Sequence, residues 1–174
     1  MKYAAFLRGI NVGGRTSVKM ENLRAVVAGL GFENVKTYIQ SGNVVFETNE
    51  TDDRKLAELL EAAIEKEFFK TPVMVRALGE IEKIVENNPF AGEQFEDKLF
   101  HVVFLREKLS DEKAEMLLAQ NRDEERFFVR GREVYCLLKS GVADSLLGKK
   151  YIDNKLKTPA TARNWRTIRK ILEL

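Results

Sequence analysis

Short apolar runs and helical periods alternate along the first half of the chain. Four runs rich in aliphatic, β-branched and aromatic residues predict strands at residues 2–7, 35–40, 44–47 and 73–76. Apolar residues at every third or fourth position predict two helices between these strands, one beginning at Met20 and one after Asp52, a good N-cap residue. The resulting order, βαββαβ, indicates a ferredoxin-like plait, in which two helices cover one face of an antiparallel sheet.

Three of these strands are apolar without alternation, at residues 4–7, 44–46 and 73–75. Strands that bury both faces have such continuous runs. Because the two helices would cover one face of the sheet, we expect the rest of the chain to cover the other. The predicted organisation is α+β: a plait over residues 1–78 and a second subdomain over 79–174, with antiparallel sheets packed into one unit.

The second half predicts a less complete plait with one fewer clear strand. Strands are expected at residues 99–105, 126–129 and 133–138, and helices at 80–87, after Ser110, at 142–147 and at the C-terminus. Thr158 and Pro159 suit the first positions of that last helix. We expect its Trp165 to be buried, with Ala162, Ile168 and Leu172 also facing inward. The same period places Arg163, Arg166 and Lys170 on another face, with Arg166 and Lys170 in solvent.

The composition of the 174 residues is that of a soluble globular protein, with 44% hydrophobic and 32% charged residues. The single cysteine, Cys136, lies in an apolar run and excludes an internal disulfide framework. The N-terminal apolar run is too short for a secretory signal, and no stretch approaches the length of a membrane span. We therefore expect a cytoplasmic protein that does not associate with membranes.

The net charge of +2 conceals a basic segment near the C-terminus. Residues 149–170 contain eight lysines and arginines and one aspartate. Such a run either marks an anionic partner, with nucleic acid as one candidate, or is the solvated face of a helix.

The strongest candidate for a site is the glycine-rich loop that follows the first strand. Gly9, Gly13 and Gly14 allow the backbone to approach a ligand or to adopt positive φ. Amides on such a loop, beside a helix N-terminus, can form a concavity suited to an anion. Positive charge comes from three cations in the same stretch, Arg8, Arg15 and Lys19.

Plait topology places this loop and the Ser41-Gly42-Asn43 turn at the same end of the sheet. Six polar residues could then converge: Arg8, Asn11, Lys19, Gln40, Ser41 and Asn43. Two interpretations remain open. Either these residues bind a ligand, or the glycines and Asn43 satisfy turn conformations while the polar side chains tie the loops together.

Other chemistries are weakly supported. Residues 9–16 match the phosphate-loop spacing with Arg15 in place of lysine, but the helical period starts only at Met20 and no strand ends in a magnesium-ligating aspartate. The chain has one histidine, His101, and one cysteine, Cys136, which are too few to bind zinc. A catalytic His–Cys pair would require these two side chains to lie close together in the fold. An RNA-recognition plait would expose aromatic residues on central strands that here look buried. We expect no metal or cofactor, and whether the protein is an enzyme stays open.

Several motifs resemble those of an uncharacterised bacterial family, domain of unknown function 1697. They are Leu7-Arg8-Gly9-Ile10-Asn11-Val12-Gly13-Gly14, Val18-Lys19-Met20, Leu30-Gly31-Phe32, Thr37-Tyr38, Gln40-Ser41-Gly42-Asn43-Val44-Val45-Phe46, Gly141, Ser145 and Thr161-Ala162-Arg163-Asn164-Trp165-Arg166-Thr167. The resemblance implies two linked ferredoxin-like subdomains. It does not indicate any particular activity. It adds Thr161, Arg163 and Asn164 to the candidate site. The connector Tyr151 to Thr158 looks longer than is usual in the family.

Our first functional hypothesis is a site for a small anionic or phosphorylated molecule. Its residues would be Arg8, Gly9, Asn11, Gly13, Gly14, Lys19, Gln40, Ser41, Asn43, Thr161, Arg163 and Asn164. Arg8 and Arg163 are expected to serve one ligand together. The alternatives are a nucleic-acid-binding module that uses the basic C-terminal segment, which is less favoured, and a protein-interaction role. The oligomeric state is left open.

Overall fold

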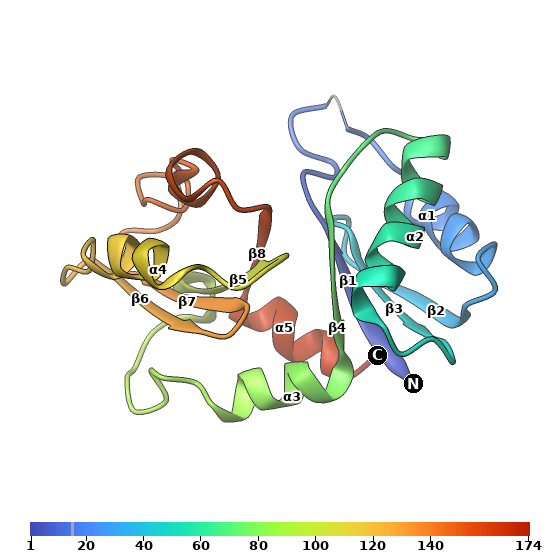
Figure 1. The fold of residues 1–174 in the computed structure, drawn as a ribbon. Coiled ribbons are helices and arrows are strands. Elements are labelled where there is room, and N and C mark those ends of the chain that lie inside the picture. Colours follow the sequence, from blue (N-terminus) through green and yellow to red (C-terminus); the bar gives the residue numbers. More distant parts are fainter. Residues whose placement is uncertain (15) are drawn as a thin grey trace. The chain divides into compact units, whose positions relative to one another are not determined.

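The computed structural model describes residues 1–14 and 16–174, and the chain divides into two compact units (Figure 1). Unit 1 comprises Met1–Val85 and Lys170–Leu174, and unit 2 comprises Glu86–Arg169. Each contains a four-stranded antiparallel sheet, and the α+β class with two ferredoxin-like plaits is confirmed.

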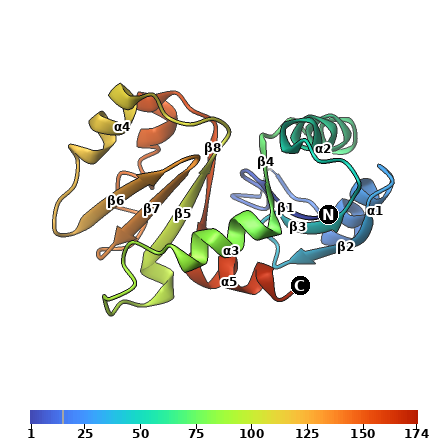
Figure 2. The same cartoon turned by 60° about the horizontal axis from the view of Figure 1, so that its bottom comes forward.

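Unit 1 has the predicted βαββαβ order. Its strands are β1 (Lys2–Leu7), β2 (Glu33–Tyr38), β3 (Asn43–Glu47) and β4 (Val73–Ala77), which lie side by side in the order β2-β3-β1-β4. Helices α1 (Met20–Ala28) and α2 (Asp53–Glu67) cover one face of this sheet (Figure 2). Helix α3 (Leu78–Glu86) follows β4.

The start of α2 confirms the capping role predicted for Asp52. Its carboxylate accepts hydrogen bonds from the amides of Arg54 at 2.9 Å and Lys55 at 3.3 Å. These amides have no partner within the helix, and a carboxylate at this end also interacts favourably with the helix dipole.

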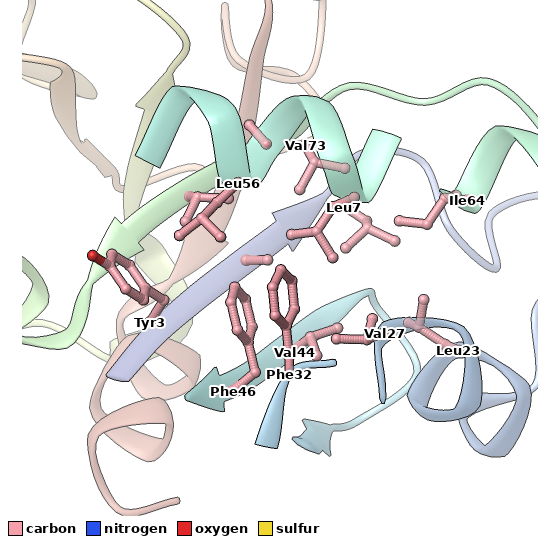
Figure 3. Packing of buried hydrophobic residues seen from close by; sticks show 14 of the residues in the cluster. Tyr3, Leu7, Leu23, Val27, Phe32, Val44, Phe46, Leu56, Ile64 and Val73 are labelled. Carbon is pink, nitrogen blue, oxygen red and sulfur yellow. The ribbon is translucent and has the colours of Figure 1, made fainter. Parts of the chain in front are cut away.

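The core of unit 1 lies between the sheet and its two helices. Alternate residues of the strands point into it, together with apolar residues from α1 and α2 (Figure 3): Tyr3, Leu7, Val44, Phe46, Val73, Leu23, Val27, Leu56 and Ile64. Phe32 stacks on Phe46 with ring centroids 4.6 Å apart. The period-2 pattern of the strands and the 3.6-residue period of the helices meet here in one apolar layer.

Two details of unit 1 differ from the sequence-based expectation. The apolar period that predicts a helix after Asp52 includes Leu59, but Leu59 is 40% exposed, because Leu56, Leu60 and Ile64 already fill the inner stripe of α2. Strand β2 ends at Tyr38, so Ile39 and Gln40 belong to the turn that leads into β3.

Unit 2 repeats the plait with a complete sheet. Its strands are β5 (Phe100–Leu105), β6 (Glu125–Arg130), β7 (Glu133–Leu138) and β8 (Ala160–Asn164), in the order β6-β7-β5-β8. Helix α4 (Asp111–Leu118) packs on this sheet and is capped by Ser110, whose hydroxyl accepts from the Lys113 amide at 3.3 Å, as predicted. A short 3₁₀ turn, η1 (Asp97–Leu99), leads into β5.

The prediction for the C-terminal part was wrong in one important respect. Thr158 and Pro159 do not start a helix, because residues 160–164 form β8, which pairs with β5 through contacts such as Ala162 opposite Val103. Helix α5 (Trp165–Leu172) begins only after Asn164, whose Oδ1 accepts from the Thr167 amide at 2.9 Å. The second plait therefore has four strands rather than one fewer. Arg163 lies on a strand and does not share a helix face with Arg166.

The helix expected at residues 142–147 is also absent, and these residues form successive turns. The buried Ser145 hydroxyl donates to the Val142 carbonyl at 2.6 Å and accepts from the Gly148 amide at 3.1 Å. The Glu125 carboxylate accepts from the Leu146 amide at 3.0 Å. Such side-chain bonds to the backbone compete with helix formation.

The connector that follows is not simply polar. It contains a π-helix, η2 (Ile152–Leu156), whose terminal residues Ile152 and Leu156 are buried in the core of unit 2.

Among the described residues, no helix combines the length and the apolar character that crossing a bilayer requires.

Candidate functional site

The loop that comprises residues 8–14 and 16–19 lies beside the turn of residues 39–42 at one end of the unit 1 sheet. The Leu7 amide donates to the Gly42 carbonyl at 2.8 Å, and the Asn11 side chain donates to the Gln40 carbonyl at 2.7 Å. The connection into β4 reaches the same place, because the Thr71 hydroxyl donates to the Arg8 carbonyl at 2.6 Å. Plait topology therefore brings these loops together as the strand order predicted.

Asn11 holds the loop in shape. Its Oδ1 accepts from the Val18 amide at 2.8 Å, while its Nδ2 donates to the Val18 carbonyl at 3.0 Å and to the Gln40 carbonyl at 2.7 Å. Its φ of 55° lies in the left-handed region, which asparagine tolerates better than most residues. The side-chain amide of Asn11 is thus engaged in hydrogen bonds within the protein, and these bonds join the two loops.

Asn43 has a similar internal role. Its side chain is fully buried, and Nδ2 donates to the Tyr38 carbonyl at 3.1 Å and to the Ser41 hydroxyl at 2.8 Å. These bonds close the turn between β2 and β3. For Asn11 and Asn43 the geometry therefore favours the interpretation in which polar side chains tie the loops together.

The residues that face solvent are of another kind. Gly9, Gly13 and Gly14 are exposed and have φ values of 64°, 64° and 75°. Their backbone amides make no hydrogen bond with any described residue. Lys19, which precedes α1, and Gln40 are exposed as well, and Arg8 is half-buried. Arg15, the third cation predicted for this loop, lies outside the described residues.

The three C-terminal candidates lie in unit 2, on β8. Thr161 and Arg163 are buried, and Arg163 Nη1 donates to the Thr161 hydroxyl at 2.7 Å and to the Ala162 carbonyl at 2.8 Å. Burial lowers the pKa of the Arg163 guanidinium to about 10. Asn164 caps α5, a role that the expected helix start at Thr158 concealed. The joint use of Arg8 and Arg163 stays a prediction.

The strand register also brings the only histidine beside the only cysteine. His101 on β5 is opposite Cys136 on β7 and opposite Asn164 on β8. Burial raises the pKa of the Cys136 thiol and lowers that of His101, so both groups are held neutral. An inaccessible, protonated thiol is a poor nucleophile, and this arrangement is that of a core. No cluster of three metal-ligating side chains occurs among the described residues.

The fold and this site define a protein of two ferredoxin-like plaits with a glycine-rich loop at the end of the first sheet. The chain belongs to the family described as "Protein of unknown function (DUF1697)", whose sequence profile matches residues 1–135. The predicted family is thereby confirmed. A search of curated proteins gave no match.

A solved structure, described as that of conserved bacterial protein SP0830 from Streptococcus pneumoniae, has a similar fold. It is 25% identical to this chain, with a TM-score of 0.78 over 99% of this chain and 97% of that one. The likeness covers both plaits.

Substitution of Asn11 by alanine is expected to lower the free energy of unfolding by about 2–3 kcal/mol, measured by chemical denaturation. It removes three hydrogen bonds and places alanine in the left-handed region. Gln40→Ala is the matched control, because the bond from Asn11 ends on the Gln40 backbone carbonyl and survives the change. Equal losses in the two variants would contradict the role of the Asn11 side chain.

Proposed function

We propose that the loop of residues 8–19 binds a small anionic, phosphorylated molecule beside the turn of residues 39–42. The observation that carries this proposal is that Gly9, Gly13 and Gly14 are exposed and that their amides make no hydrogen bond with the described residues. Backbone N–H groups on a positive-φ loop are donors suited to phosphate oxygens.

The charges and the stiffness of the loop support the proposal. Lys19 is exposed at the end of the loop and provides a mobile positive charge for a phosphate. The Asn11 side chain and the bond from Leu7 to Gly42 fix the loop before any ligand arrives. Donors that are already in place lose little conformational freedom on binding, which favours affinity.

The geometry supports binding rather than nucleotide hydrolysis. In a phosphate loop the helix begins at the lysine of the motif, whereas α1 begins at Met20, four residues after Thr16. The glycine loop is therefore separated from the helix by residues 17–19, of which Lys19 has an extended backbone.

The basic C-terminal segment is a weaker candidate for nucleic acid than its composition indicates. Arg163 is buried, Arg169 pairs with Asp97 at 2.5 Å, and Lys170 pairs with Glu173 at 2.6 Å. These contacts remove or neutralise three of the eight cations in the run. Anion binding at the glycine-rich loop is accordingly the function we favour.

Phosphate titration followed by ¹⁵N–¹H NMR tests the proposal. We expect the amide signals of Gly9, Gly13 and Gly14 to move in a saturable way at constant ionic strength. Lys19→Gln should weaken binding about tenfold, the effect of losing one charge-assisted contact. Lys108→Gln, which changes an exposed lysine of unit 2, should leave binding unchanged. Glycine signals that do not respond to phosphate would overturn the proposal.

A further inference from the structure

We infer that the site takes an amphiphilic anion, a phosphate monoester on a short alkyl chain, with Val12 and Ile39 contacting the chain. This inference rests on the proposed function and names the class of ligand. It starts from two apolar side chains that the fold leaves in solvent at the glycine loop.

Val12 and Ile39 are 67% and 52% exposed, and among the large hydrophobic residues that the structure describes only Met1, at 64%, is comparable. They lie on neighbouring loops, because Asn11, which precedes Val12, is hydrogen-bonded to Gln40, which follows Ile39, at 2.7 Å. Val12 also directly precedes Gly13, one of the glycines with an unbonded amide. A single exposed apolar residue is ordinary, but two on adjoining loops beside free donors form a mixed surface.

Ile39 is also in an unfavourable conformation. Its φ is 47°, in the left-handed region, where a β-branched side chain clashes with its own backbone. The other non-glycine residues with positive φ in the described part of the chain are two asparagines and two lysines, none of them β-branched. Asparagine or glycine would satisfy this turn at lower energy, and an exposed isoleucine gains little from burial in return. The side chain therefore serves something other than the fold.

The two kinds of group specify the two ends of a ligand. The glycine amides and Lys19 suit a phosphate, whereas Val12 and Ile39 offer apolar surface next to it. Each methylene group that leaves water on these side chains should strengthen binding about fourfold. The same chemistry occurs in a soluble alkyl phosphate and in the headgroup region of an anionic lipid, and the test separates them.

The experiment titrates the full chain with inorganic phosphate, ethyl phosphate, butyl phosphate and butanol, and with phosphatidylcholine vesicles containing phosphatidic acid. We expect affinity to rise from phosphate to butyl phosphate, with butanol and vesicles binding weakly or not at all. The V12S/I39N double variant should keep the affinity for inorganic phosphate and lose the gain with chain length. V142S, which changes an exposed valine of unit 2, should behave as the unsubstituted protein.

A second readout concerns stability. Ile39→Asn alone should raise the melting temperature, because asparagine tolerates the left-handed conformation while the isoleucine side chain gains little from the fold. A marked decrease would mean that Ile39 has a structural role and would overturn the inference.

The outcomes distinguish the two proposals. Phosphate binding that is independent of chain length, or a gain that persists in V12S/I39N, overturns the amphiphile inference and leaves the anion site intact. Vesicle binding without a gain for butyl phosphate also overturns it, in favour of a membrane surface. If neither phosphate nor butyl phosphate binds, the proposed function itself fails.

Discussion

Replacement of Trp165 by alanine is expected to lower the free energy of unfolding by about 3–5 kcal/mol. The indole is 6% exposed and stacks on Phe100, with ring centroids 4.4 Å apart and an interplanar angle of 28°. Phe90 and Phe95 pack edge-on against the same Phe100 ring. Truncation would leave a cavity beside this aromatic cluster, and the surrounding rings are too rigid to fill it.

Lys170→Ala is the control for this prediction, because it lies on the same helix and its side chain is in solvent. Its ion pair with Glu173 is exposed on both sides, so the change should stay within about 0.5 kcal/mol. Denaturant unfolding of the two variants measures the difference. Comparable losses would show that the faces of α5 are assigned incorrectly.

Gly42→Ala is expected to destabilise the protein by roughly 3 kcal/mol through two separate effects. The residue has a φ of 75°, where a Cβ atom costs about 1–2 kcal/mol. That atom would also lie 2.8 Å from Leu7 Cβ and 3.2 Å from Ile10 Cγ1, a degree of overpacking that costs about 1–3 kcal/mol. Only glycine allows the turn to approach β1 this closely.

Gly13→Ala separates these two effects. Its φ of 64° imposes the same backbone strain, but nothing lies within 4 Å of the added Cβ position. The loss should therefore be about 1–2 kcal/mol, the backbone cost alone. If thermal or chemical unfolding gave equal losses for the two variants, close packing against Leu7 would not be a reason why residue 42 must be glycine.

Much of unit 1 follows from local sequence. The continuous apolar runs of β1, β3 and β4 and the helical period of α2 predicted the plait, because burial of an apolar face depends mainly on the spacing of apolar residues. Asp52, and Ser110 in unit 2, marked helix starts because a cap acts within three residues of the chain. The proximity of the glycine loop and the 41–43 turn followed from strand order alone.

Only the tertiary structure decided the C-terminal part. Thr158 and Pro159 favour a helix start locally, but pairing of residues 160–164 with β5 satisfies a whole row of backbone groups and prevails. Likewise, Glu125, distant in sequence, accepts a hydrogen bond from the Leu146 amide in a stretch that was expected to be helical. Long-range bonds of this kind leave no periodic signal in the sequence.

The candidate site divides in the same way. The sequence by itself determined which residue types gather at the glycine loop, since glycines, cations and asparagines are visible one by one. The structure decided their roles: Asn11 and Asn43 donate to backbone carbonyls, Arg163 is buried on a strand, and Gly9, Gly13 and Gly14 are exposed. Ile39 was predicted as part of a strand, and its exposed left-handed position emerged only in the fold. The physical reason is that a polar group's partner, and the backbone conformation at a turn, depend on which segments meet in space rather than on neighbours in the chain.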